Sequence, residues 1–323
     1  GYLPWDLPGE MGAVLDAASP DVLVFTKTEV WPTLVAAAAA RNVPCALVGG
    51  TVPPGAGRAR WPARALLRST WARLELVGAI SGADAEGFRT LGVRSSALEV
   101  TGDPGIDSAA QRARGADPEA AYLRPFIADR RPTVVAGSTW PADDAVLLPA
   151  LLAARTGVPE MRVILAPHEP DAGHVAALVH ELETSGWSAA TLGDVEGRGS
   201  AEGVDVVVVD RVGVLAHLYT VGDVAYVGGG FHDAGLHSVL EPAAARLPVC
   251  FGPRHRNARA AGELLAEEGA QVADDADSLG RILTRWLSDG ATHNYAARRA
   301  FGYIERHLGA AERSAALLGA FFA

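Results

Sequence analysis

A glycine-rich turn in the second half of the sequence has the residue types that bind a nucleotide. The run 223–227 predicts a buried strand, the glycines 228–230 a sharp turn, and the segment from Ser238 the start of a helix. A strand, a turn around Gly229 and a helix N-terminus offer backbone N–H groups that suit a phosphate. Glu241 could accept two hydrogen bonds from the vicinal hydroxyls of a ribose. The alternative is a capping box, in which Ser238 and Glu241 only satisfy backbone groups at the helix start.

Two further polar turns follow predicted strands in the same half. Ser138 lies in a small turn after the strand 133–136 and before a predicted helix, whose N-terminal amides could stabilise a phosphate. Plain helix capping is the alternative for this turn. Pro167 and His168 follow the strand 162–166. The imidazole could hydrogen-bond a base, a phosphate or a sugar hydroxyl, or it could simply face solvent.

Charged side chains also follow a predicted strand in the first half. Lys27 and Glu29 stand at the carboxyl edge of this strand, where open α/β sheets bind their ligands. The alternative for Glu29 is a first-turn carboxylate that complements a helix dipole. His232, Asp233 and His237 contain two histidines five residues apart across a glycine loop, which is not the spacing of a helical metal site. We therefore predict no metal there.

Short β-branched runs alternate with Ala- and Leu-rich stretches of helical period along most of the chain. This alternation is typical of βαβ units, so we predict an α/β protein with doubly wound parallel sheets. The predicted strands are 21–26, 44–48, 76–80, 97–101, 133–136, 162–166, 205–209, 223–227 and 248–251, and the predicted helices are 30–40, 83–91, 143–155, 171–183, 239–246 and 259–268.

Two Rossmann-like domains are expected. The stretch 107–131 has no strand pattern, so we place the boundary near residue 128, between domains 1–128 and 129–323. A doubly wound domain begins with the strand and turn that usually carry its ligand loop. The first domain shows only its later strands and begins with Gly1 rather than methionine, so we expect its N-terminal part to be missing.

Composition argues against several classes of protein. The net charge of −10 gives no overall basic field for a nucleic acid. Cys45 and Cys250 lie in separate apolar runs without metal-ligand spacing, which predicts two buried thiols rather than a disulfide or a zinc site. No apolar run reaches the roughly 18 residues of a membrane-spanning helix. No signal sequence opens the chain.

Taken together, these segments resemble the Kdo transferase family, whose members transfer 3-deoxy-D-manno-octulosonic acid (Kdo) from CMP-Kdo to lipid A precursors in Gram-negative bacteria. The resemblance runs from residue 3 to about residue 268 and rests on seven matches in order. The segment 28–32 is similar to the family's E-T-E-x-W-P. The other matches are 137–141, 166–169, 212–215, 226–231, 235–243 and 251–253.

The resemblance implies a GT-B fold, in which two Rossmann-like domains face each other and the second holds CMP-Kdo as the donor substrate. It implies that Glu29 stabilises the transition state. No metal or other cofactor is expected, and the acceptor is a lipid A precursor at the cytoplasmic face of the bacterial inner membrane. By similarity the nucleotide contacts are Pro167, His168, Val212, Gly213, Val214, Ser238, Val239, Leu240 and Glu241, and Ser138 and Gly229 complete the predicted donor site.

Three departures from the family's motifs bear on the chemistry. The family's catalytic base, a glutamate in an S-x-G-E-like motif, would lie upstream of this chain. Gly105 stands where T-G-N-x-K-F-D has a basic residue. Ser238 replaces an asparagine, and 166–169 is a shorter form of P-R-H-P-E-R.

Two alternatives remain open. One is another GT-B enzyme, such as a UDP-sugar transferase or an epimerase, because the glycine turn and the ribose glutamate recur in that fold. The other is a nucleotide-binding relative that has lost catalysis, which the missing base and Gly105 suggest.

Overall fold

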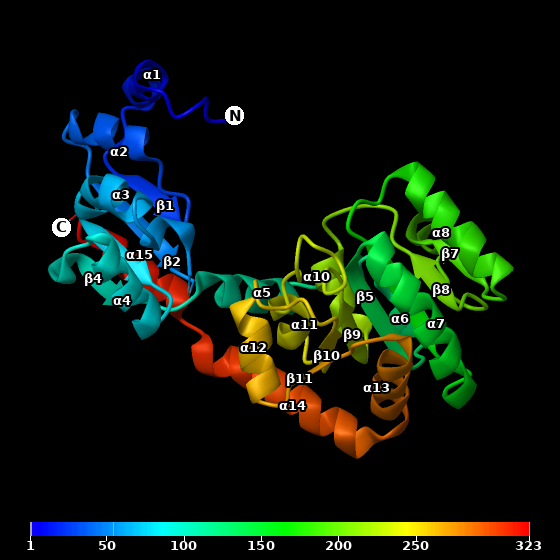
Figure 1. Cartoon of the computed structure of the whole chain (residues 1–323). Helices are drawn as coiled ribbons and strands as arrows, with labels where there is room; N and C mark the ends of the chain where they lie inside the picture. The colour runs from blue at the N-terminus through cyan, green and yellow to red at the C-terminus, as the bar shows by residue number, and fades with distance from the viewer. Residues whose placement is uncertain (1, 54, 323) are drawn as a thin grey trace. The chain divides into compact units, whose positions relative to one another are not determined.

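The chain forms two compact units, each built on a parallel sheet (Figure 1). The computed structural model describes residues 2–53 and 55–322. The N-terminal unit comprises residues 1–107 and 307–323, and the C-terminal unit comprises residues 108–306. The prediction of an α/β chain with two parallel-sheet domains is therefore confirmed.

The sheet of the N-terminal unit has four parallel strands in the order β1-β2-β3-β4. Leu47 of β2 lies in one apolar core with Val35 of α2, Trp71 of α3 and Phe88 of α4. The elements of this unit are α1 (Pro8–Ala18), β1 (Leu23–Thr26), α2 (Pro32–Ala39), β2 (Cys45–Gly50), η1 (Gly57–Ala59), α3 (Ala63–Ala72), β3 (Leu76–Ala79), α4 (Gly82–Leu91), η2 (Ser95–Ala97), β4 (Leu98–Val100), the start of α5 (Pro104–Arg114) and α15 (Ala310–Gly319).

The last helix of the chain, α15, belongs to the N-terminal unit. The N–H groups of Gly309 and Ala311 at its start donate to the carboxylate of Asp107 at 2.6 and 2.9 Å. Arg313 Nε donates to the carbonyl oxygen of Thr101 at 2.9 Å. The division at residue 107, with a return at 307, therefore differs from our single boundary near residue 128. Composition shows where a strand pattern stops, but it gives no sign that a distant segment returns to pack.

The C-terminal unit has a seven-stranded parallel sheet in the order β11-β10-β9-β5-β6-β8-β7. Alternate residues of β5 enter different cores, because Val134 lies in a core with Leu147 of α7 and Val135 in a core with Leu218 of α10. Helices thus cover both faces. The elements are α6 (Arg124–Ala128), β5 (Thr133–Thr139), α7 (Pro141–Gly157), β6 (Arg162–Pro167), α8 (Ala172–Thr184), β7 (Ala189–Thr191), α9 (Leu192–Arg198), β8 (Val206–Val208), α10 (Leu215–Leu218), η3 (Tyr219–Val221), β9 (Val224–Val227), α11 (Leu240–Ala244), β10 (Val249–Phe251), α12 (Arg259–Ala266), β11 (Ala270–Val272), α13 (Ala276–Ser288) and α14 (Gly290–His307).

The cysteine prediction is confirmed: Cys45 and Cys250 are both free and buried. Within residues 2–53 and 55–322, no helix combines the length and the apolar character needed to cross a membrane.

Candidate functional site

The strand order of the C-terminal sheet reverses between β5 and β9. Strands β6, β8 and β7 lie on one side of β5, whereas β9, β10 and β11 lie on the other side. In open α/β sheets the loops on either side of such a switch point leave a crevice in which ligands bind. Ser138 lies at the carboxyl end of β5, and Gly229 lies just after β9. The fold therefore brings these two predicted residues to one edge.

The carboxyl end of β5 and the turn after β9 are in direct contact. A Cβ at Gly228 would lie only 2.2 Å from the carbonyl oxygen of Ser138, so no larger residue fits at this position. Ser138 itself has a left-handed backbone with φ of 56°, a conformation that non-glycine residues adopt rarely. Gly228, the first glycine of the triplet, therefore allows the turn after β9 to approach the end of β5 closely, and this contact explains the glycine without a phosphate.

A buried carboxylate fixes the glycine turn from inside. Asp143, in the first turn of α7, accepts hydrogen bonds from the N–H groups of Trp140 at 2.9 Å, Gly229 at 2.8 Å and Phe231 at 3.3 Å, and from the hydroxyl of Tyr226 at 2.9 Å. Asp143 is fully buried. The expectation of free N–H groups is therefore wrong for Gly229 and Phe231, because the buried Asp143 side chain already accepts their hydrogen bonds.

Replacing Asp143 with alanine should lower the free energy of unfolding by about 3 kcal/mol, because buried N–H and O–H donors lose their acceptor. Urea denaturation measures this loss. The matched variant Asp143→Asn keeps one acceptor oxygen and should lose less. An alanine variant as stable as the wild-type protein would show that the carboxylate does not organise the turn.

Three imidazoles gather around the indole of Trp140. The His168 and His232 rings stack on it with centroid separations of 4.5 and 4.3 Å. Trp140 Nε1 donates to Nε2 of His237 at 2.9 Å, and the His168 and His237 rings lie 4.4 Å apart. The structure thus joins the predicted His168 to three residues outside the predicted set. Apart from the aromatic types, the sequence gives no sign of this cluster, since its members follow three different strands.

The indole hydrogen bond makes His237 an acceptor at Nε2. Burial, and next the imidazole of His168, lowers the pKa of His237. A neutral imidazole is therefore favoured at this position. Among the described residues, no three His, Cys, Asp or Glu side chains are placed to hold a metal ion.

Glu241 forms an ion pair rather than a cap. Arg112 Nη1 donates to its Oε1 at 2.6 Å, and the glutamate side chain is 22% exposed. Helix α11 begins at Leu240 with Val239 as its N-cap residue, whose side chain makes no cap bond. Ser238 Oγ accepts from the N–H of Leu240 at 3.4 Å. The serine half of the capping-box alternative is therefore present, but the glutamate half is wrong, because Glu241 pairs with Arg112. Sequence reasoning missed Arg112, which lies 129 residues from its partner.

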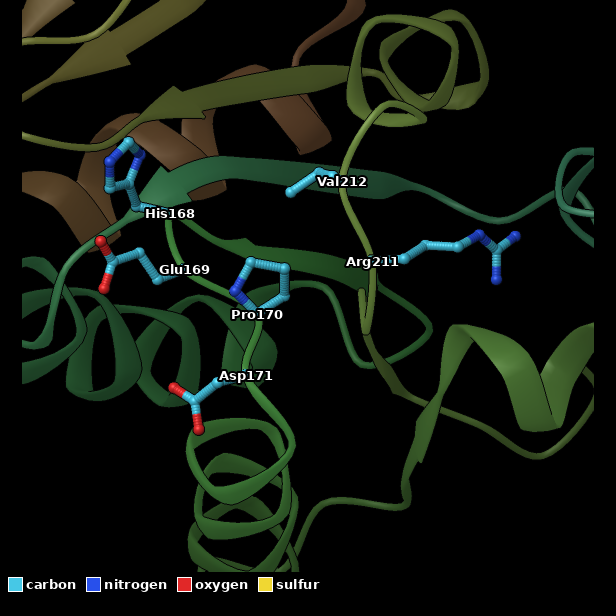
Figure 2. Close-up of a pocket in the computed structure, with 6 residues that line it drawn as sticks. All are labelled: His168, Glu169, Pro170, Asp171, Arg211 and Val212. Atoms are coloured by element: carbon cyan, nitrogen blue, oxygen red, sulfur yellow. The ribbon is translucent and has the colours of Figure 1, made fainter.

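The loops after β6 and β8 enclose an open pocket of about 480 Å³. Figure 2 shows His168 and Glu169 from one loop and Arg211 and Val212 from the other. Val212 is 77% exposed. Pro167 is buried as the last residue of β6, Gly213 and Ser238 are exposed, Val214 and Leu240 are half-buried, and Val239 is buried. The predicted nucleotide contacts thus differ widely in how accessible their side chains are.

Glu29 is the one predicted site residue in the N-terminal unit. It is exposed and follows β1. Helix α2 begins only at Pro32 and has no acidic residue in its first turn. The helix-dipole alternative for Glu29 is therefore wrong. Glu29 lies in the N-terminal unit, and the other predicted site residues lie in the C-terminal unit.

A second acid in the first turn of α7 is poised to titrate near neutral pH. Burial raises the pKa of Asp144 to about 6, and its Oδ2 lies 4.0 Å from His174 Nε2. A carboxyl whose pKa is higher in the folded state contributes stability that is complete below about pH 4 and is lost as the pH rises through 6.

We therefore expect Asp144→Asn, which cannot ionise, to be more stable than the wild-type protein at pH 8 by about 3 kcal/mol, from the size of the pKa shift. The difference should nearly vanish at pH 3.5, below the pKa of the unfolded carboxyl. Urea unfolding at both pH values measures it, and the exposed Asp117→Asn serves as the control. Equal stability of wild type and Asp144→Asn at pH 8 would argue against a strained carboxylate.

Two parallel-sheet units, one with a topological switch point between β5 and β9, are the architecture of a GT-B protein. A putative UDP-N-acetylglucosamine 2-epimerase from Listeria monocytogenes superposes with a TM-score of 0.66 at 12% identity, over 97% of this chain and 78% of that chain. At this identity the likeness concerns the fold alone. The GT-B prediction is confirmed.

Sequence comparison identifies the family within this class. Residues 1–108 match the family model of 3-deoxy-D-manno-octulosonic-acid transferase. The 3-deoxy-D-manno-octulosonic acid transferase of Bordetella pertussis is 30% identical over 327 residues, which cover 97% of this chain and 72% of that protein. The transferase of the same name from Haemophilus influenzae is 25% identical, over 98% of this chain and 73% of that protein. The chain belongs to the Kdo transferase family.

Proposed function

We propose that this chain transfers Kdo from CMP-Kdo to a lipid A precursor at a membrane surface. The observation that carries the reaction is the 30% identity to a Kdo transferase across almost the whole chain. The switch point between β5 and β9 supports a nucleotide-linked donor, because dinucleotides and mononucleotides bind at such points. The lipid acceptor and the membrane location follow from the motif resemblance.

The donor site that we propose lies at the carboxyl edge of the C-terminal sheet. The ribose hydroxyls would bind Glu241, and the rest of the nucleotide would contact His168 and the segment 212–214. Because Asp143 already uses amides of the glycine turn, the negative charge of CMP must be met elsewhere. Arg112 is bound to Glu241 and its side chain is 60% exposed, so it is our candidate for this role.

The reaction is a displacement at the anomeric carbon of Kdo. A base removes the proton of an acceptor hydroxyl, the oxygen attacks the anomeric carbon, and the bond to the CMP phosphate breaks. Positive charge develops on the sugar as the bond breaks, and the carboxylate of Glu29 would stabilise it. None of the residues of this chain is assigned as the base.

The test is direct: the protein is incubated with CMP-Kdo and a lipid A precursor, and the lipid is analysed by mass spectrometry. Addition of one or more Kdo units is expected. A thermal-shift series with CMP and UDP separates the alternatives, since CMP should raise the melting temperature more than UDP. Preference for UDP, without Kdo transfer, would favour a different GT-B enzyme.

A further inference from the structure

Lys27 is the only lysine in this chain, whose other 27 Lys or Arg positions are all arginines. The two side chains differ chemically, because lysine carries a compact ammonium with three donors on a flexible stem. It lies directly after β1, at the carboxyl edge of the N-terminal sheet, and it is exposed. The single lysine of the chain therefore lies at the edge where α/β sheets bind ligands, which makes it a candidate ligand-binding residue.

The backbone of Lys27 is also unusual. Its φ is 57°, in the left-handed region, and its N–H donates to the carbonyl oxygen of Val48 at 3.0 Å. Most other left-handed non-glycine residues in the described parts of the chain follow the end of a helix, where this conformation is common. Within residues 2–53 and 55–322, only Lys27 and Ser138 adopt it at the carboxyl end of a strand. Strain that persists at such a position is characteristic of functional sites.

The surroundings of Lys27 can hold an anion. Glu29 stands two residues further on, and the guanidinium of Arg58 donates to the carbonyl oxygen of Thr28 at 3.3 Å. Burial lowers the pKa of Arg58 against the opposing charge of Glu29, so these two groups lie close enough to interact. The edge therefore carries two cations and one carboxylate.

The first turn of α5, which contains Gly105, lies near the same edge. A Cβ at Gly49, the residue after Val48, would lie 3.3 Å from Pro104 Cδ. Position 105 carries no side-chain charge, so the cations named at this edge are Lys27 and Arg58.

We propose that Lys27 is a substrate-binding residue whose ammonium binds a carboxylate or phosphate group beside Glu29. This inference rests on the proposed function, because it takes the edge at Glu29 as the place of sugar transfer. Two sources can supply the anion: the carboxylate of Kdo, which is an octulosonic acid, and a phosphate of the acceptor. Both present acceptor oxygens that an ammonium can neutralise.

Amine footprinting tests this directly, because Lys27 is the only side-chain amine. The protein is treated with an acetylating reagent, and modification at Lys27 is measured by mass spectrometry with CMP, with CMP-Kdo, and with phosphorylated or dephosphorylated lipid A precursor. Protection by CMP-Kdo but not CMP identifies the sugar carboxylate, and protection only by the phosphorylated lipid identifies the phosphate. The control Arg94→Lys adds an exposed amine whose modification should be insensitive to every ligand. Absence of protection in all arms would overturn the proposal.

Substitution of Lys27 provides a second test. A lysine with a purely structural role would change the melting temperature but not kcat/KM. Lys27→Gly suits the left-handed backbone, so its melting temperature should equal or exceed that of the wild-type protein, while kcat/KM should fall about 10- to 100-fold with the loss of one charge-assisted contact. Lys27→Arg should recover part of the activity. If the wild-type protein transfers Kdo and Lys27→Gly is equally active, the inference about Lys27 is wrong and the proposed function stands. If wild type transfers none, the proposed function fails, and footprinting still decides whether Lys27 binds an anion.

Discussion

Replacing Glu29 with glutamine is expected to lower kcat by about 100- to 1,000-fold while the affinity for CMP stays unchanged. Glu29 is exposed at the carboxyl edge of the N-terminal sheet and takes no part in capping α2. A carboxylate that meets charge developing in the transition state contributes on this scale, and its loss affects turnover rather than binding. All proposed nucleotide contacts lie in the C-terminal unit, so CMP binding should not respond. Steady-state kinetics and calorimetry measure the two quantities.

The control for this variant is Glu99→Gln, which removes another exposed carboxylate of the N-terminal unit, on β4. It should leave kcat within about twofold, as surface substitutions usually have small effects. Equal losses of turnover and CMP affinity in Glu29→Gln would instead make Glu29 a binding residue. A large fall in melting temperature would make it a folding residue.

Glu241→Gln is expected to weaken CMP binding by about 1 to 3 kcal/mol, the usual range for a hydrogen bond to a charged group. The substitution keeps the shape of the side chain but replaces one acceptor oxygen with a donor, so it cannot receive both ribose hydroxyls. Isothermal titration calorimetry with CMP measures the change. Unchanged affinity would remove the ribose assignment.

The ion pair with Arg112 must be separated from this effect. Arg112→Ala and the double variant complete a thermodynamic cycle with Glu241→Gln. If Glu241 acts only by holding Arg112, Arg112→Ala should weaken CMP binding, and adding Glu241→Gln to it should cause no further loss of affinity. If it binds the ribose, Glu241→Gln should lose affinity even without the arginine. Glu202→Gln, an exposed glutamate of the same unit, is the matched control.

Much of the fold could be predicted from the sequence. The run at 133–136 lies within β5 and the run at 162–166 within β6, because an apolar β-branched segment buried on both faces has few other conformations. Short elements at the sheet edges were missed. β7 contains only Ala189, Ala190 and Thr191, so its strand conformation comes from pairing with β8 rather than from local preference.

The candidate site was predicted less completely. Ser138, His168, Gly229 and Glu241 follow strands or begin a helix, and a pattern of strands places such residues at sheet edges. Their actual partners, Trp140, Asp143 and Arg112 among them, depend on how distant loops meet. A local motif indicates which groups could bind a ligand, but not whether the protein itself already uses them.

The sequence by itself determined the class of fold, the order of most strands along the chain and the family. Apolar periodicity and motifs are each contained in a short segment, and many such segments along the chain agree. Only the tertiary structure decided that Asp143 occupies the glycine turn, that Glu241 pairs with Arg112 and that α15 returns to the N-terminal unit. These contacts join residues 86 to more than 200 positions apart. Hydrogen bonds at such separations are set by packing in three dimensions, which no local pattern encodes.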